Sequence, residues 1–241
     1  MKRLYVSFIR MLRVVFRAVG LLSFWERRME RSRWARWLRS LFAVYDFDDL
    51  VKLDLPWWNL EAVDWVSNYL EDKPGVRAFE YGCGASTVWL SRRCDTVTTI
   101  EHDLEWAKVV TTKFESLDNV AFKAIPPTEG CPVDETAYLC GRAGWEDRSF
   151  KSYVTSIREQ ASLFDVIVID GRARSACLEE AKSFLAEDGI IIFDNAGRDR
   201  YKAAIDTAGL EQIRFSGLTA CLPYPDQTYI LRKATDRRDP A

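Results

Sequence analysis

The sequence has few of the residues that build metal and redox sites. It contains a single histidine, His102, among 241 residues, and its six cysteines include no CxxC pair. Zinc sites usually combine several cysteines and histidines, often with such a pair, so an ordinary Cys/His zinc site is excluded. We expect reduced thiols in a cytoplasmic protein, with a disulfide between Cys131 and Cys140 as the alternative.

The sequence also lacks an uninterrupted apolar run near its start. Residues 4–25 are largely apolar, but Arg10, Arg13 and Arg17 lie among them. An arginine at the centre of a bilayer costs roughly 2.5–3.5 kcal/mol, and a cleavable signal needs an unbroken apolar region. We therefore predict neither a membrane-spanning helix nor a cleavable signal peptide.

The sequence as a whole has little excess of charge of either sign, but its first 40 residues have a strong positive excess. The formal net charge is −2, which argues against a protein covered with nucleic acid. Residues 1–40, however, hold eleven Lys/Arg and two Glu, a net charge of +9, and the remaining residues carry −11. The contrast predicts a basic arm, residues 1–45, and a body, residues 46–235, followed by a short tail, residues 236–241.

The basic arm has helical periodicity. Arg3, Arg10, Arg13 and Arg17 recur at spacings of seven, three and four, and apolar residues cover a broad face beside them. We predict an amphipathic helical arm that lies flat on an anionic membrane surface, peripheral to the inner face of the membrane. Two alternatives stay open: the arm packs on the body or a second subunit, or it binds RNA or another polyanion.

The body alternates between strand and helix patterns. Strands are predicted by short runs rich in Val, Ile, Phe and Thr, and amphipathic segments lie between most of them. Repeated alternation of this kind predicts an α/β fold with a doubly wound, mostly parallel sheet of seven strands. The predicted strands are residues 76–81, 96–101, 120–125, 164–170, 190–194, 212–216 and 228–231.

A glycine turn follows the first predicted strand. Gly82 and Gly84 stand where that strand gives way to a helix, and such a turn lets the backbone bend sharply and a ligand approach closely. An acid, Glu101, ends the second strand about 20 residues later, where a carboxylate can accept both hydroxyls of a ribose. The combination predicts a nucleoside-binding site.

The motif E-x-G-x-G-x-S, beginning at Glu80, resembles motif I of the class I S-adenosylmethionine-dependent methyltransferases. The resemblance covers most of residues 57–233 and implies that the last strand is antiparallel. It also implies that the glycine turn lines the methionine part of the cofactor, that Glu101 binds the ribose and that His102 lies beside the adenine. The cofactor-binding residues expected on this basis are Glu80, Gly82, Cys83, Gly84, Ser86, Thr87, Glu101, His102 and Asp170.

Two further strands end in polar residues. Asp170 ends one of them, and Asp194 and Asn195 end the next. Carboxyl ends of parallel strands meet at the ligand crevice, and oxygen ligands suit Mg²⁺. The three residues resemble the Asp…Asp-Asn metal triad of catechol-type O-methyltransferases, which implies a Mg²⁺ site. That family's lysine base is replaced here by Ala173. Without a metal, Asp170 or Asp194 becomes the candidate general base.

Several residues are expected to contact the methyl acceptor. Arginine is a poor base and a good fork for oxygen ligands. The candidates are Arg172, Arg174, Trp57, Trp58 and Tyr201, with residues 126–150 as a loop that selects the substrate. Trp57 and Trp58 have core packing as their alternative role.

Taken together, the residues and the resemblance indicate a methyltransferase. We expect O-methylation of a small, saccharide or lipid-linked acceptor at a membrane surface, with Mg²⁺ as a second cofactor in the metal-assisted version. The alternatives are an RNA ribose methyltransferase that uses the basic arm and a non-enzymatic membrane scaffold with a methyltransferase-like fold. The retained Gly82, Gly84 and Glu101 argue against the scaffold.

Overall fold

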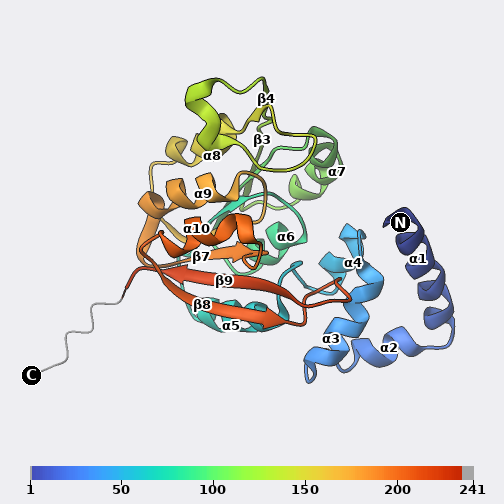
Figure 1. The fold of residues 1–241 in the computed structure, drawn as a ribbon. Helices are drawn as coiled ribbons and strands as arrows, with labels where there is room; N and C mark the ends of the chain where they lie inside the picture. The colour runs from blue at the N-terminus through green and yellow to red at the C-terminus, as the bar shows by residue number, and fades with distance from the viewer. Residues whose placement is uncertain (1, 235–241) are drawn as a thin grey trace, which may run out of the picture.

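The computed structural model describes the backbone of residues 2–234 and the side chains of residues 6–234. The predicted tail, residues 236–241, lies outside the described residues. Seven strands form the main sheet in the order β3-β2-β1-β6-β7-β9-β8, and β9 runs antiparallel to both of its neighbours (Figure 1). The prediction of a doubly wound, mostly parallel seven-stranded sheet is confirmed. The strands are β1 (Arg77–Tyr81), β2 (Thr96–Glu101), β3 (Val120–Ala124), β6 (Phe164–Ile169), β7 (Leu185–Asp194), β8 (Glu211–Gly217) and β9 (Asp226–Arg232).

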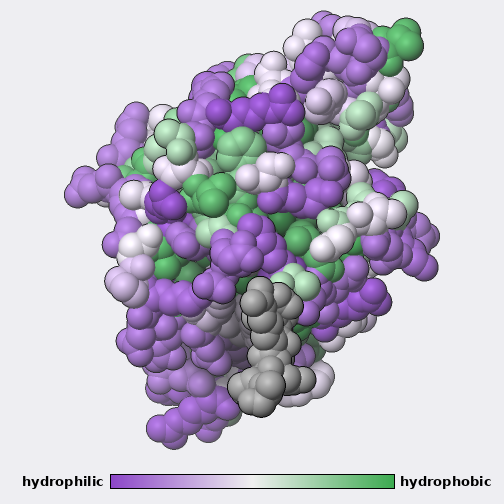
Figure 2. Space-filling model, turned by 90° about the vertical axis from the view of Figure 1, so that its left-hand side faces the viewer, coloured by the Kyte–Doolittle hydropathy of each residue, from purple (hydrophilic) through white to green (hydrophobic). Residues whose placement is uncertain are grey.

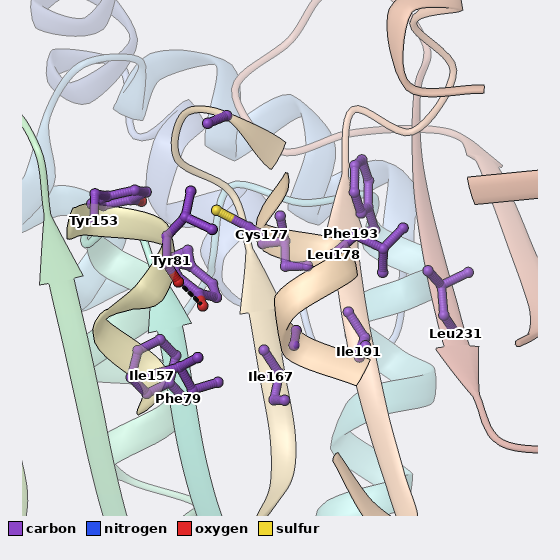
Figure 3. Packing of buried hydrophobic residues seen from close by; sticks show 14 of the residues in the cluster. Phe79, Tyr81, Tyr153, Ile157, Ile167, Cys177, Leu178, Ile191, Phe193 and Leu231 are labelled. Carbon is purple, nitrogen blue, oxygen red and sulfur yellow. Dashed lines mark hydrogen bonds between the residues drawn. The ribbon is translucent and has the colours of Figure 1, made fainter. Parts of the chain in front are cut away.

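The central strands are apolar because both of their faces are covered. In β6, Ile167 and Ile169 join one hydrophobic cluster, and Val166 and Val168 join the cluster on the other side of the sheet. Figure 3 shows the first cluster, in which the Tyr81 hydroxyl donates a 2.8 Å hydrogen bond to the Val154 carbonyl. Successive side chains of β6 thus point to opposite faces of the sheet and contribute to a hydrophobic cluster on each face.

Helices cover both faces of this sheet (Figure 1). One face packs against α5 (Leu60–Leu70) and α6 (Ala85–Ser91), with α7 (Leu104–Phe114) beside them. The other packs against α8 (Lys151–Thr155), α9 (Arg174–Ala181) and α10 (Asp199–Asp206). On the side turned away from the arm, the surface is mainly hydrophilic with scattered apolar residues (Figure 2).

The chain reverses its winding direction between β1 and β6. It proceeds outward from β1 to β2 and β3, then returns to place β6 on the other side of β1. In open α/β sheets, ligands bind outside the carboxyl ends of the strands at such a switch point. The glycine turn after β1 and Asp170 after β6 both lie there, and the Asp170 amide donates to the Tyr81 carbonyl at 3.0 Å.

The arm consists of helices that lie beside the carboxyl ends of the strands (Figure 1). They are α1 (Lys2–Ala18), α2 (Leu21–Glu26), α3 (Arg33–Ser40) and a 3₁₀ turn (Leu41–Ala43), followed by α4 (Phe47–Lys52). Ile9, Leu22 and Phe42 form a cluster that includes body residues such as Leu60 and Cys221. One side of the arm therefore packs on the body. None of the described helices is long and apolar enough to cross a membrane.

A buried ion pair fixes the arm to α4. The guanidinium of Arg39 donates to both carboxylate oxygens of Asp49, at 2.8 and 2.9 Å, and only 1% of its side chain is exposed. Arg13 of α1 pairs with Asp46 and Asp49. A buried charge is stable only when it is paired, so these contacts hold α1 and α3 against α4.

Candidate active site

The glycine turn is held from behind by Glu80. Its carboxylate is fully buried and accepts hydrogen bonds from the hydroxyls of Ser86, Thr87 and Thr99, the last at 2.8 Å. Thr87 in turn accepts from the amide of Gly84 at 3.0 Å. Burial raises the pKa of Glu80 to about 7, against the effect of these hydroxyls. Glu80 therefore positions the turn and does not reach an open cavity.

The two glycines of the turn serve different purposes. Gly82 has φ +93°, and a Cβ there would lie 2.8 Å from both Cα and N of Gly171. Gly82 is thus required by the close approach of two backbone segments. A Cβ on Gly84 would meet nothing nearer than the Ser86 Oγ, at 4.0 Å. The space beside Gly84 is open to a ligand.

That space belongs to a cavity of about 370 Å³, here called the turn cavity. Its walls come from the turn, from the start of α7, from the end of β6 and from the arm. The lining residues are Tyr45, Asp46, Phe47, Leu50, Trp57, Cys83, Gly84, Ala85, Ser86, Asp103, Trp106 and Asp170. Trp106 is fixed by a 2.9 Å hydrogen bond from its Nε1 to the Cys83 carbonyl. The size is within the range of small-ligand pockets, about 300–1,000 Å³.

Glu101 lies behind Cys83, next to the turn cavity. One carboxylate oxygen accepts from the amides of His102 and Asp103, both at 2.8 Å, and the other accepts from the amide of Cys83 at 3.1 Å. Burial acts to raise the pKa of Glu101, but the His102 side chain and these amides outweigh it, so the pKa is lowered. Glu101 is therefore an ionised acceptor joined directly to the glycine turn.

His102 is enclosed by aromatic rings. Its ring centroid lies 5.7 Å from those of Trp145 and Phe150 and 5.8 Å from that of Tyr153. Trp145 and Phe150 come from the stretch 126–150, which includes the short strands β4 (Thr128–Glu129) and β5 (Arg148–Ser149). This loop, expected to select the substrate, therefore covers the Glu101–His102 end of the site.

The residues fit a nucleoside cofactor in the main points. Gly84, with its open backbone position, and the aromatic side chain of Trp106 line the turn cavity, and Glu101, whose lowered pKa favours an ionised carboxylate, lies buried behind its wall with 3% exposure. Ribose hydroxyls need a carboxylate acceptor, and a base needs an apolar face. Cys83 lines the cavity and its thiol lies 3.5 Å from Glu101, so the acid lies one residue behind the wall.

Asp170 and Asp194 share one guanidinium. Arg174 donates to an Asp170 carboxylate oxygen at 2.8 Å, and its other terminal nitrogen lies 3.9 Å from an Asp194 carboxylate oxygen. Burial and the charge of Asp170 raise the pKa of Asp194 well above its usual range. Burial also raises the pKa of Asp170, although Arg174 opposes the shift. Two nearby carboxylates titrate as a pair, so one of them retains a proton to higher pH.

The predicted Mg²⁺ ligands do not form a coordination set in this arrangement. The guanidinium of Arg174 lies between the two carboxylates, where a divalent cation would have to bind. The Asn195 amide donates to Asp226 at 2.9 Å. Within residues 2–234 no group of three or more His, Cys, Asp or Glu side chains is arranged to hold a metal. The residues do not fit the metal-assisted version.

A second cavity of about 290 Å³ adjoins the first and is here called the edge cavity. It lies at the ends of β6 and β7 and is lined by Tyr45, Trp57, Asp170, Asp194, Asn195, Arg198, Leu222, Tyr224 and Asp226. The walls of both cavities include Tyr45, Trp57 and Asp170. Two larger cavities, of about 500 and 510 Å³, touch neither the glycine turn nor the end of β6.

The expected acceptor residues are placed differently from one another. Trp57 lines both cavities. Trp58 is fully buried against Trp89, and Tyr201 is buried against Phe193. Neither lines the turn cavity or the edge cavity.

The two arginines also lie outside both cavities. Arg174 is 3% exposed and donates to the carbonyls of Asp170, Gly171 and Asp194. It therefore ties the ends of β6 and β7 together. Arg172 has a buried Nε without a hydrogen-bond partner among the described residues.

Sequence reasoning missed five residues of the edge cavity: Tyr45, Arg198, Leu222, Tyr224 and Asp226. Three of them, Leu222, Tyr224 and Asp226, lie in or next to the connection between β8 and β9. Tyr45 carried no signal, since the pattern placed it in the arm. Its φ of +55° is unusual for a tyrosine.

Comparison with solved structures identifies the fold. An rRNA methylase from Streptococcus thermophilus superposes with a TM-score of 0.50 at 9% identity, over 72% of this chain and 95% of that one. The N-methyltransferase NodS from Bradyrhizobium japonicum WM9, in complex with S-adenosyl-L-homocysteine, gives a TM-score of 0.45 at 14% identity, over 73% and 87%. No protein-family model matches the chain. A search of curated proteins finds no match either.

Proposed function

We propose that this chain, which has the Rossmann-like fold of the class I S-adenosylmethionine-dependent methyltransferases, methylates an oxygen of a small or lipid-linked acceptor, with saccharides as the favoured class. The observation that carries the proposal is the junction of the turn cavity and the edge cavity at Tyr45, Trp57 and Asp170. Methyl transfer requires donor and acceptor to be held in line. A nucleoside beside Gly84 and an acceptor in the edge cavity meet at that junction.

The residues at the junction supply the proton chemistry. Bound S-adenosylmethionine brings an electrophilic methyl group on a sulfonium. Asp170 lines both cavities and its side chain is 27% exposed, so its carboxylate can accept the proton of an acceptor hydroxyl. Arg174 orients that carboxylate, and Asp194, with its raised pKa, holds the proton of the pair. General-base catalysis of this kind contributes about 10²–10⁴-fold.

The edge cavity suits a sugar. Tyr45, Trp57 and Tyr224 offer aromatic surfaces to the apolar face of a ring, and Asp170 and Asp226 offer acceptors for hydroxyl groups. The same walls disfavour RNA, because three acidic side chains and a single arginine, Arg198, line the cavity. Phosphate-rich ligands need clustered positive charge.

Cofactor binding is the first test. Titration calorimetry with S-adenosylhomocysteine should give saturable binding to the full chain. Glu101→Gln should weaken it about 10–100-fold, because a carboxylate contributes charge-assisted hydrogen bonds to ribose hydroxyls. Glu105→Gln, an exposed acid on the adjacent helix, is the matched control and should bind normally. No binding by the unmodified chain would favour a non-enzymatic scaffold.

The division between cavities gives the second test. Trp106 lines the turn cavity alone and Tyr224 the edge cavity alone. Trp106→Ala should weaken S-adenosylhomocysteine at least about fivefold, as expected for loss of a stacking face. Tyr224→Ala should leave that affinity unchanged and raise KM for a saccharide acceptor. Asp170→Asn should lower kcat at least about 100-fold. Equal effects of Trp106→Ala and Tyr224→Ala on nucleoside binding would contradict the assignment.

A further inference from the structure

The first helix of the arm has one broad apolar surface, and only part of it packs within the chain. Leu12 and Phe16 pack on the arm's cluster, where the Phe16 ring lies 5.1 Å from that of Phe42. On the other side a set of apolar side chains, here called the α1 stripe, is exposed. The stripe comprises Phe8 (52% exposed), Met11 (58%), Val14 (70%), Val15 (51%) and Val19 (70%). In Figure 1, α1 is the outermost element at this end of the molecule.

Basic side chains border the α1 stripe. Val14 lies four residues after Arg10 and three before Arg17, so both arginines are its neighbours on the helix surface. Arg10 and Arg17 are exposed, and so are Arg27, Arg28 and Arg31 after α2, a helix that contacts α1. None of the five lies within ion-pair distance of a described carboxylate.

The other arginines of the arm behave differently. Arg13, Arg33, Arg36 and Arg39 all pair with acids, and those pairs hold the arm together. Two sets of arginines are therefore present: one serves the fold, and the other is exposed and forms no ion pair with a described carboxylate. Arg10 and Arg17 of this second set border the α1 stripe, and the charge of Arg10 also acts on Asp46. An anionic lipid surface complements both features of the second set, since headgroups take the guanidinium groups and the headgroup–acyl boundary takes the apolar side chains.

We propose that α1 docks the protein flat on an anionic lipid surface through the α1 stripe, with Arg10 and Arg17 at the headgroups. A second copy of the chain fits less well, because a two-fold contact through the stripe would bring Arg10 and Arg17 of each copy near the same residues of the other. The inference rests on the proposed function in one respect. Tyr45 of the arm lines the edge cavity, so docking through α1 would bring that cavity near lipid-linked acceptors.

Vesicle flotation tests the docking with the full chain. The protein should float with phosphatidylcholine vesicles that contain 30% phosphatidylglycerol and remain unbound with phosphatidylcholine alone. Arg10→Gln/Arg17→Gln should weaken binding about 25-fold, since each arginine near an anionic surface contributes about fivefold. Met11→Gln/Val15→Gln should weaken it at least about tenfold. Both variants change exposed positions to a good helix former, and circular dichroism checks their folding.

Matched variants on the body are the controls. Val109→Gln removes another exposed valine, on α7, and Arg200→Gln/Lys202→Gln removes two exposed charges on α10. Both should float like the unmodified chain. The proposal is overturned if the unmodified chain does not float, or if Met11→Gln/Val15→Gln floats as well as the unmodified chain. It is also overturned if light scattering shows that the unmodified chain is a dimer and that this variant is not.

A nucleic-acid outcome is also distinguishable. The protein could bind a single-stranded RNA and fail to float with vesicles. If Arg10→Gln/Arg17→Gln abolished that RNA binding and Met11→Gln/Val15→Gln retained it, the arginines would bind a polyanion, and the proposed lipid surface would be overturned. None of these measurements involves methyl transfer. Calorimetry with S-adenosylhomocysteine involves no vesicles, so failure of the docking and failure of the proposed function are separable.

Discussion

Glu80 gives the sharpest physical prediction about the glycine turn. Its carboxylate is fully buried, and its pKa is raised from 4.5 to about 7. Because the folded-state pKa lies above that of the unfolded chain, protonated Glu80 stabilises the fold fully below about pH 4.5. That contribution is lost as the pH rises through about 7. The loss between pH 5 and pH 8 amounts to about 2–3 kcal/mol.

Glu80→Gln removes the ionisation and keeps the shape. Urea unfolding of both proteins, followed by tryptophan fluorescence between pH 5 and pH 8, gives the free energy of unfolding at each pH. The variant should gain about 2–3 kcal/mol relative to the unmodified chain across this range, because only the latter must bury a charge at high pH. Other titrating groups largely cancel in the difference. Glu105→Gln, which changes an exposed acid, should show a flat difference.

A constant difference between Glu80→Gln and the unmodified chain would refute this reasoning. It would mean that the three hydroxyls of Ser86, Thr87 and Thr99 stabilise the carboxylate enough to offset its burial, so that Glu80 is ionised in the fold at pH 5. The turn would then carry a buried negative charge next to the candidate cofactor site.

Two further predictions concern packing and buried charge. Gly82→Ala should lower the free energy of unfolding by about 3–5 kcal/mol, since its Cβ would meet backbone at 2.8 Å and its φ is positive. Gly75→Ala is the control: its φ is also positive but the space around it is open, so the free energy of unfolding should fall by only about 1 kcal/mol. Arg39→Met should lose roughly 3 kcal/mol, because the buried carboxylate of Asp49 keeps only Arg13 as an ion-pair partner. Arg33→Met, at an exposed pair, should lose less than about 1 kcal/mol. Urea unfolding measures all four, and equal losses within either pair would contradict the burial argument.

The sheet could be predicted because its information is local. The run Phe164–Ile169 is apolar at nearly every position, as a strand covered on both faces must be, and Gly82 follows a strand where a sharp turn is needed. Carboxyl ends of parallel strands share one edge, so the position of Glu101, Asp170 and Asp194 at that edge follows from strand positions alone.

The orientation of individual side chains could not be predicted in the same way. Arg174 was expected to face the substrate, yet it lies at the first turn of α9 and fills the space between β6 and β7, which only the packed structure defines. Tyr201 and Trp58 likewise enter cores whose shape depends on residues far away in the sequence. Periodicity identified α1 as amphipathic, but which half of its apolar surface packs on Phe42 depends on the rest of the arm.

The arm and the candidate site form one structural unit, and this decides how the arm should be tested. Tyr45 packs edge-on against Trp57, with ring centroids 5.2 Å apart, and both line the turn cavity and the edge cavity. Arg13 of α1 pairs with Asp46, which follows Tyr45 in the sequence, so α1 is linked to the walls of these cavities. Deleting residues 1–45 would remove a wall of both cavities and expose the cluster around Leu60. Loss of activity in such a truncation would therefore say nothing about lipid binding, whereas substitutions confined to the α1 stripe leave both cavities intact.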